Sequence, residues 1–260
     1  MPVLRSARHK MPRSWRRMLA LLVTARNEEQ TVGQVITTFH EQIRPRFRLS
    51  KTIVVDDDSS DRTALVALHA GASLVLPSGG LGLAQSFQLG VDAALGLGAT
   101  TIVHTDADGQ YAPDDIHALL HKLGDGADLA IGNRLWRRPP HMQLVRYVGN
   151  IALSQAISAI SRVAVADSQS GYRAFSARLA AAVRISSKFT YTQEQIIRAA
   201  SLGFRIAQTP VSFHERRFGS SRLVRSPADY GYRVLRDLVK TLSAPPETRS
   251  RTDLVSRVRR

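Results

Sequence analysis

Two stretches decide the fold of this chain: VVDDDSSDRT at residues 54–63 and HTDADGQYAPDD at residues 104–115. In each, a cluster of acidic residues comes directly after a short apolar run of the kind that forms a strand. Similar runs alternate with helical patterns through the first half of the chain, which is typical of βαβ units and a parallel sheet. Ligands of such sheets bind beyond the carboxyl ends of the strands. The acidic clusters are therefore predicted to line a ligand site.

The rest of the chain extends this α/β pattern. We expect strands at 19–23, 52–55, 73–76, 101–104 and 128–131, with helices at 28–39, 62–69, 83–95 and 113–123 between them. The second half is predicted to hold helices at 145–160, 177–183, 192–202 and 227–242, an extended stretch at 173–175 and a strand at 205–211. We expect one domain over residues 18–242, between a basic N-terminal tail at 1–17 and a basic C-terminal tail at 243–260.

The second acidic cluster has the spacing of a metal site. Asp106 and Asp108 are separated by one residue, so in an extended loop their side chains point the same way and can share an ion with Gln110. The chain has no cysteine, and an octahedral site of oxygen ligands suits Mg²⁺ or Mn²⁺. The alternative is that these acids only cap the following helix, but Asp114 and Asp115 already stand at that helix's first turn.

The two signature stretches, together with DSQSGYRAF at 167–175 and PVSFHERRFGSSR at 210–222, resemble family 2 glycosyltransferases in order and spacing. The resemblance runs from about Leu19 to Leu242. It implies the nucleotide-diphospho-sugar transferase fold of GT-A type, a mixed and mostly parallel sheet with helices on both faces. It also implies a metal-dependent enzyme that transfers a sugar from a nucleotide-sugar donor with inversion at the anomeric carbon.

The resemblance assigns roles around the donor. A departing nucleoside diphosphate develops negative charge, which a metal ion and positive side chains stabilise. For Arg216 and Arg217, the alternative is that they are solvated surface arginines. The implied donor residues are Asp56 and Asp57 at the base and ribose with Glu28 beside them, Asp106, Asp108 and Gln110 on the metal, and Arg216 and Arg217 closing over the diphosphate.

Within the family, the chain is similar to the dolichol-phosphate (polyprenyl-phosphate) mannosyltransferase branch. The glycine-rich stretch GLGLAQSFQLG at 80–90 and the motif IGNR at 131–134 carry this likeness. It implies that Arg134 and Arg146 grip the phosphate of a polyprenyl-phosphate acceptor, because an arginine fork matches phosphate oxygens. The alternative for both arginines is a structural ion pair.

The acceptor decides whether a base is needed. A sugar hydroxyl usually requires a carboxylate base, whereas a phosphate monoester is already anionic and can attack directly. Glu194 in YTQEQII is the first candidate base and Asp167 the second, although Glu194 could equally be favourable charge in the first turn of a helix. The rival enzyme activity is transfer to a hydroxyl of a glycolipid, polysaccharide or metabolite.

The net charge of +15 predicts an acidic partner. Residues 1–17 carry six Lys or Arg and no acid, and residues 245–260 carry five Arg against two acids. Such tails suit an anionic membrane surface, unless they only solubilise the protein. Because no run is apolar enough to span a bilayer, we expect a cytoplasmic protein on the inner membrane face. A nucleic-acid partner is not expected, since only 6% of residues are aromatic and no reading motif is present.

Overall fold

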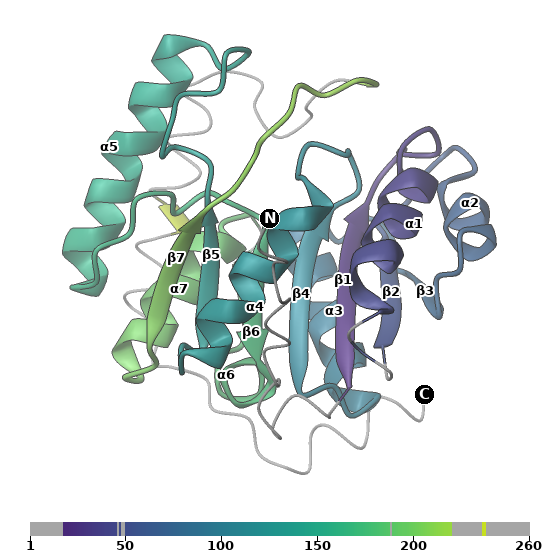
Figure 1. Ribbon diagram of the computed structural model, residues 1–260, viewed down its shortest axis with the longest axis horizontal. Helices are drawn as coiled ribbons and strands as arrows, with labels where there is room; N and C mark the ends of the chain where they lie inside the picture. The colour runs from purple at the N-terminus through teal and green to yellow at the C-terminus, as the bar shows by residue number, and fades with distance from the viewer. Residues whose placement is uncertain (1–17, 46, 48–49, 188, 220–235, 238–260) are drawn as a thin grey trace, which may run out of the picture.

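The computed structural model describes residues 18–219, except 46, 48–49 and 188, together with residues 236–237 (Figure 1). The two predicted tails, and all but two residues of the helix predicted at 227–242, lie outside the described residues. The predicted domain limits at residues 18 and 242 therefore stay a prediction.

The described residues form a seven-stranded sheet in the order β3-β2-β1-β4-β6-β5-β7. β6 runs antiparallel to both of its neighbours, β4 and β5, and the other pairings are parallel. The predicted mixed, mostly parallel sheet is confirmed. The strands are β1 (Leu19–Ala25), β2 (Ser50–Asp56), β3 (Leu74–Pro77), β4 (Thr101–Asp106), β5 (Leu129–Asn133), β6 (Arg173–Ser176) and β7 (Ile206–Pro210).

Helices cover both faces of this sheet. Successive side chains of a strand point to opposite faces, and β1 accordingly sends Leu21 into one apolar core and Leu22 into another. The first core includes residues of α1 and α4, and the second includes residues of α3 and α7. The helical elements are α1 (Val32–Ile43), α2 (Thr63–His69), α3 (Leu83–Gly96), the 3-10 helix η2 (Pro113–Asp115), α4 (Ile116–Gly124), α5 (Leu144–Ser161), α6 (Ala177–Ala182) and α7 (Tyr191–Ser201).

α1 begins at Val32, four residues after its predicted start at residue 28. The preceding residues turn toward the loop after β2. Asn27 adopts a left-handed conformation with φ 53°, and its backbone N donates to Ser59 Oγ at 2.8 Å. The backbone N of Glu28 donates to Thr63 Oγ1 at 2.8 Å. These contacts hold Glu28 at the edge of the sheet, outside the helix.

Figure 1 shows how the remaining segments surround the sheet. The segment after β7 extends toward the loops that follow β4 and β1, at the end of the sheet where those strands finish. α5 stands on one side of the molecule, packed on α7, while α2 lies at the opposite end of the long axis. None of the helices in the described residues is long and apolar enough to cross a membrane.

Candidate active site

The register of the parallel strands brings the acidic clusters to one edge. Ala25 at the end of β1 lies beside Asp56 of β2, and Thr24 lies beside Asp106 of β4. The three loops that follow these strands therefore meet around the end of β1. This arrangement agrees with the prediction that the acids line a site at the carboxyl ends of the strands.

Asp106 and Asp108 form the electrostatic centre of this edge. Burial raises the pKa of Asp106 to about 6, with Arg134 opposing the shift. Burial and the neighbouring charge of Asp106 raise the pKa of Asp108 to about 6. Two partly buried carboxylates that repel one another are stabilised by a cation between them. Their chemistry fits a divalent ion.

The pair does not form a complete metal site on its own. Within the described ranges, no three His, Cys, Asp or Glu side chains come together as a metal-binding group. Gln110 is held close by, because its backbone N donates to Asp108 Oδ1 at 3.1 Å, but its side-chain Nε2 donates to the carbonyl of His214 at 2.9 Å. The amide oxygen is the side-chain atom of Gln110 that could bind a metal, and further oxygens would have to come from the substrate.

A buried histidine, His104, lies two residues before Asp106 on β4. Nδ1 of His104 lies 2.6 Å from the carbonyl of Gly171, which can only accept, so this nitrogen carries the proton. Nε2 then accepts from Thr24 Oγ1 at 3.2 Å. Burial lowers the pKa of His104 to about 4, so the ring is neutral at physiological pH. Reasoning from the sequence gave His104 no role, and no local pattern signals one.

Gly171 leaves room for Asp106. A Cβ at this position would lie 2.8 Å from Asp106 Oδ2 and 3.1 Å from the hydroxyl of Tyr191. Gly171 precedes β6, so the antiparallel strand beside β4 brings a glycine against the metal-site acid. The motif DSQSGYRAF contains this glycine, but the motif does not show what the glycine contacts.

We expect Gly171→Ala to weaken divalent-metal binding by about tenfold or more without unfolding the protein. A Cβ under 3 Å from Asp106 Oδ2 must push that carboxylate aside, and loss of one charge-assisted contact costs about 1.5–3 kcal/mol. Calorimetric titration with Mn²⁺ and nucleoside diphosphate measures the change. Gly149→Ala, where an added Cβ meets nothing within 4 Å, is the matched control; equal metal affinity in both variants would show that Gly171 does not support the site.

The segment after β7 closes over the acids. The backbone N of His214 donates to the carbonyl of Gln110 at 2.7 Å, so this segment is hydrogen-bonded to the loop that follows β4. Arg216 then forms an ion pair with Glu28. Burial raises the pKa of Glu28, against the opposing effect of Arg216. Arg217 is exposed. The structure thus brings Arg216 to the predicted donor site and leaves Arg217 at its rim.

Asp57 is already engaged by the glycine-rich segment. Its Oδ1 accepts from Ser78 Oγ at 2.6 Å, from Gly82 N at 3.0 Å and from Ser86 Oγ at 3.1 Å. Arg26 lies 3.6 Å from its other oxygen. The sequence predicted a contact with the nucleotide here, and the structure adds a second task, which is to hold the start of α3 against the site.

The two predicted phosphate grips lie in different environments. Arg134 is buried, and its Nε and Nη2 donate to Asp167 at 2.7 and 2.9 Å. Its guanidinium also lies 5.0 Å from the centre of the Phe213 ring. For Arg134 the structure therefore shows the alternative, a structural ion pair. Arg146 is exposed in the first turn of α5.

Glu194, the first candidate base, is fully buried beside Arg198 at 2.8 Å. It accepts from the backbone N atoms of Ser186 at 3.0 Å and Ser187 at 2.8 Å. Burial opposes its ionisation, but these donors hold the pKa of Glu194 below its usual value. Together with the Asp167 ion pair, this means that both candidate bases are tied to arginines as parts of the framework.

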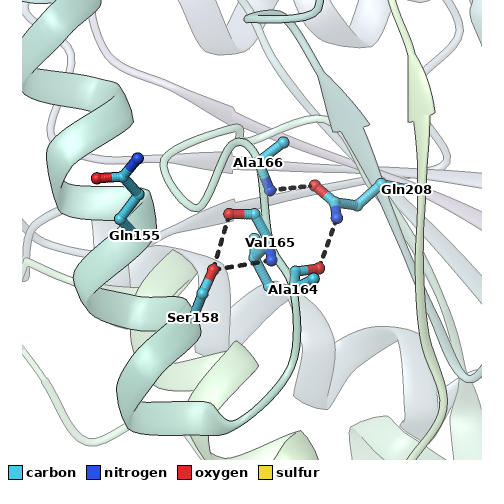
Figure 2. A pocket seen from close by; sticks show the side chains of 6 residues that line it. All are labelled: Gln155, Ser158, Ala164, Val165, Ala166 and Gln208. Atoms are coloured by element: carbon cyan, nitrogen blue, oxygen red, sulfur yellow. Dashed lines mark hydrogen bonds between the residues drawn. The ribbon is translucent and has the colours of Figure 1, made fainter.

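A hollow between α5 and β7 is lined in part by residues 164–166, which directly precede Asp167 (Figure 2). Gln208 accepts from the backbone N of Ala166 at 2.7 Å and donates to the carbonyl of Ala164 at 2.8 Å. Ser158 Oγ bonds both polar backbone atoms of Val165. These polar groups are paired with one another, so they fix the residues before Asp167 and do not indicate a ligand.

The pH dependence of stability provides a test of the acidic pair. A carboxyl whose folded pKa is raised takes up protons on folding as the pH falls, so the contribution of Asp106 and Asp108 to stability in the absence of metal should rise from about pH 8 to about pH 5, whereas buried His104 acts in the opposite direction. In excess chelator at about pH 8, we expect Asp108→Asn to raise the melting temperature by a few °C, since it removes a buried like charge. The gain should vanish near pH 5, as thermal unfolding across that range would measure. A lower melting temperature at about pH 8 would contradict the repulsion.

Comparisons with known proteins agree with this fold and edge. The structure is similar to glucosyl-3-phosphoglycerate synthase from Mycobacterium tuberculosis, which was solved in complex with Mn²⁺, uridine diphosphate and phosphoglyceric acid. The TM-score is 0.66 over 88% of this chain and 80% of that chain, at 19% identity. The predicted GT-A fold is confirmed.

The chain belongs to glycosyl transferase family 2, whose profile matches residues 20–174. A dolichyl-phosphate hexose transferase of Haloferax volcanii is 28% identical over 199 residues, which are 76% of this chain and 83% of that protein. A polyprenol monophosphomannose synthase of Mycolicibacterium smegmatis is 27% identical over 227 residues, which cover 78% of this chain and 80% of that protein. The predicted family and its polyprenyl-phosphate branch are therefore both represented among the relatives.

Proposed function

We propose that this enzyme transfers a sugar, with inversion, from a nucleoside diphosphate sugar to a polyprenyl phosphate. One observation carries the choice of acceptor: the two candidate bases, Glu194 and Asp167, are each held by an arginine inside the framework. A hydroxyl acceptor would need such a base, whereas a phosphate monoester attacks as an anion. The names of the two polyprenyl-phosphate relatives support the same acceptor class.

The donor would bind along the edge formed by the loops after β1, β2 and β4. Glu28, Asp56 and Asp57 would contact the nucleoside. Asp106 and Asp108, with the amide oxygen of Gln110, would hold Mg²⁺ or Mn²⁺. When bound, such an ion neutralises charge on the departing diphosphate. The Mn²⁺ and uridine diphosphate in the similar synthase structure support this use of the edge.

Arg216 is suited to act on the leaving group. In the absence of donor it pairs with Glu28, and a diphosphate offers more negative charge than one carboxylate. Exchange of Glu28 for the diphosphate would place the guanidinium where negative charge develops. Arg217, at the rim, would add a second positive charge. The solvated alternative stays open for Arg217, because its side chain is exposed.

The acceptor phosphate would approach from the side of α5. Arg146 is the exposed arginine of the predicted pair, and it would meet the phosphate directly. Arg134 would act as a positioning residue, since its ion pair with Asp167 holds the guanidinium over the Phe213 ring. Sugar transfer to phosphate then requires alignment of the acceptor and stabilisation of the leaving group.

Arg146→Ala should raise the KM for a short, soluble polyprenyl phosphate by about tenfold to a hundredfold, because a charge-assisted contact is worth about 1.5–3 kcal/mol. The KM for the nucleotide sugar should stay unchanged, since the metal edge is intact. Arg162→Ala, at the other end of the same helix, is the control. Equal acceptor saturation in wild type and Arg146→Ala would remove Arg146 from the acceptor site.

The second candidate function is transfer to a hydroxyl, as on a glycolipid, polysaccharide or metabolite. The similar synthase structure contains phosphoglyceric acid, a molecule with a hydroxyl group, and this observation supports the second candidate. At 19% identity, the similarity itself shows the fold alone. A hydroxyl-bearing acceptor that is glycosylated faster than a polyprenyl phosphate would establish it. The charge alone raises a nucleic-acid-binding reading, and a salt-dependent DNA shift without donor hydrolysis would revive it.

The proposed acceptor also places the enzyme at a membrane. We propose that it works at the cytoplasmic, inner face of an anionic membrane, with the basic tails 1–17 and 243–260 near the lipid headgroups. Each basic residue near such a surface contributes about 1 kcal/mol. The similarity to enzymes named for lipid-linked phosphates supports this position.

A further inference from the structure

α5 carries an apolar stripe on its outward face. The helix meets the body through the opposite face, where Ser154 and Ile157 are buried. Spacings of three or four residues place the stripe on one side of the helix, and Val145 is 75% exposed and Val148 is 54% exposed. The stripe consists of Val145, Val148, Ala152, Ala156, Ala159 and Ile160, all of them exposed.

Positively charged residues flank this stripe. Residues 129–166 contain five arginines and no Asp or Glu. Arg146 and Arg162 are exposed at the two ends of the helix, and Arg137 and Arg138 are exposed in the loop before it. A soluble helix normally turns a polar face to water. Here the outward face is apolar and its flanks are cationic.

An exposed tryptophan stands at the start of this surface. Trp136 is 52% exposed, and its ring lies 5.0 Å from the guanidinium of Arg137. Tryptophan and arginine both favour the boundary between lipid headgroups and acyl chains, because each has an apolar part and a polar end. Trp136 donates from Nε1 to the carbonyl of Val211 at 3.2 Å, which fixes its ring beside the segment that leads to the active site.

We propose that α5 lies flat in the interface of an anionic bilayer, with the stripe in the upper acyl region and the flanking arginines among the lipid phosphates. The charges favour lipid over a second copy, since apposing two such faces would bring their arginines together. This inference rests on the proposed function. It explains how a membrane-borne acceptor would reach the enzyme, because Arg146, the proposed contact for the acceptor phosphate, would lie at the lipid surface. Its vesicle test does not depend on sugar transfer.

The test uses Trp136 as a local probe. In the full-length Trp15→Phe protein, Trp136 is the only remaining tryptophan. With vesicles of equal parts phosphatidylglycerol and phosphatidylcholine, we expect a blue shift of its emission and quenching by lipids brominated on the acyl chain. Vesicles of phosphatidylcholine alone should bind far more weakly, because the arginines then lack anionic partners.

Val145→Gln combined with Val148→Gln should weaken vesicle binding by about tenfold or more, since two exposed valines no longer enter the apolar region. Glutamine is a better helix former than valine, so the helix and the hydrolysis of soluble donor should persist. The matched control is Leu65→Gln combined with Leu68→Gln on α2, where the leucines are 50% and 51% exposed at the opposite end of the molecule (Figure 1). This control should bind vesicles as wild type does.

Three results would overturn the proposal. The first is equal vesicle binding by the valine and leucine variants. The second is a dimer in sedimentation without lipid that the valine variant dissociates, because the stripe would then face a second copy. The third is loss of Trp136 quenching when residues 1–17 and 243–260 are deleted, because the tails alone would then hold the protein at the lipid. Retained vesicle binding without transfer to any polyprenyl phosphate would instead contradict only the proposed acceptor and leave the membrane contact of α5 intact.

Discussion

Asp108→Asn should lower sugar transfer by on the order of a hundredfold or more, because a divalent ion contributes several kcal/mol to stabilising the departing diphosphate. Asp108 is one of two carboxylates whose pKa burial raises to about 6, so a cation is what makes two negative charges tolerable there. Excess chelator should abolish turnover of wild type, and added Mn²⁺ or Mg²⁺ should restore it. Initial rates with a soluble nucleotide sugar measure both effects.

The control for this experiment is Asp125→Asn, which makes the same chemical change at the end of α4. Asp125 is exposed and pairs there with His121, away from the edge where the strands finish. It should turn over as wild type does. Full activity of the wild-type enzyme in excess chelator would contradict the metal assignment, even if Asp108→Asn were inactive.

Glu194→Gln should damage stability far more than chemistry. Breaking a buried ion pair by removing one partner costs about 3–5 kcal/mol, and Arg198 would be left buried without its carboxylate. The hydrogen bonds from Ser186 and Ser187 would also weaken. We expect a clear fall in the urea midpoint, with kcat of the folded protein within severalfold of wild type. The stability difference should shrink as the pH falls through the lowered pKa of Glu194, since wild type then loses its own charge.

Arg178→Ala is a suitable comparison, because it removes an arginine that is 72% exposed, while the buried carboxylate of Asp128 keeps hydrogen bonds from Ser176 and from the backbone N of Arg205. The stability loss should therefore be well below that of Glu194→Gln. A loss of several orders of magnitude in kcat for Glu194→Gln, at unchanged stability, would make Glu194 the base. The acceptor would then be a hydroxyl. The family assignment would stand.

Short sequence patterns predict the strands and helices that alternate along the first half of the chain. The strands β1, β2 and β4 and the helix after Pro113 follow from apolar runs, proline at a first turn and acids at the helix start. The position of β6 between β4 and β5 could not be predicted, because its antiparallel partners lie about 70 and 45 residues earlier in the chain. That strand brings Gly171 against Asp106.

The acids of the site were visible in the sequence because they directly follow strands. The tasks of the other charged residues were not, because each depends on a distant partner. Arg134 meets Asp167, 33 residues away, and Asp57 meets Ser78 and Gly82, the latter in the glycine-rich segment. A phosphate grip and a structural ion pair look the same in a sequence; only burial and bidentate geometry distinguish them.

In the proposed function, the acidic edge holds a metal and a nucleotide sugar for transfer to a polyprenyl phosphate. The most direct measurement incubates the full chain with Mn²⁺, a panel of nucleotide sugars and a short polyprenyl phosphate, and follows the glycolipid product by mass spectrometry. We predict one glycosyl-phosphoprenol product that depends on Mn²⁺, is lost in Asp108→Asn and has inverted anomeric configuration. Metal-dependent donor turnover that glycosylates only hydroxyl acceptors, with no sugar on the phosphate, would contradict it.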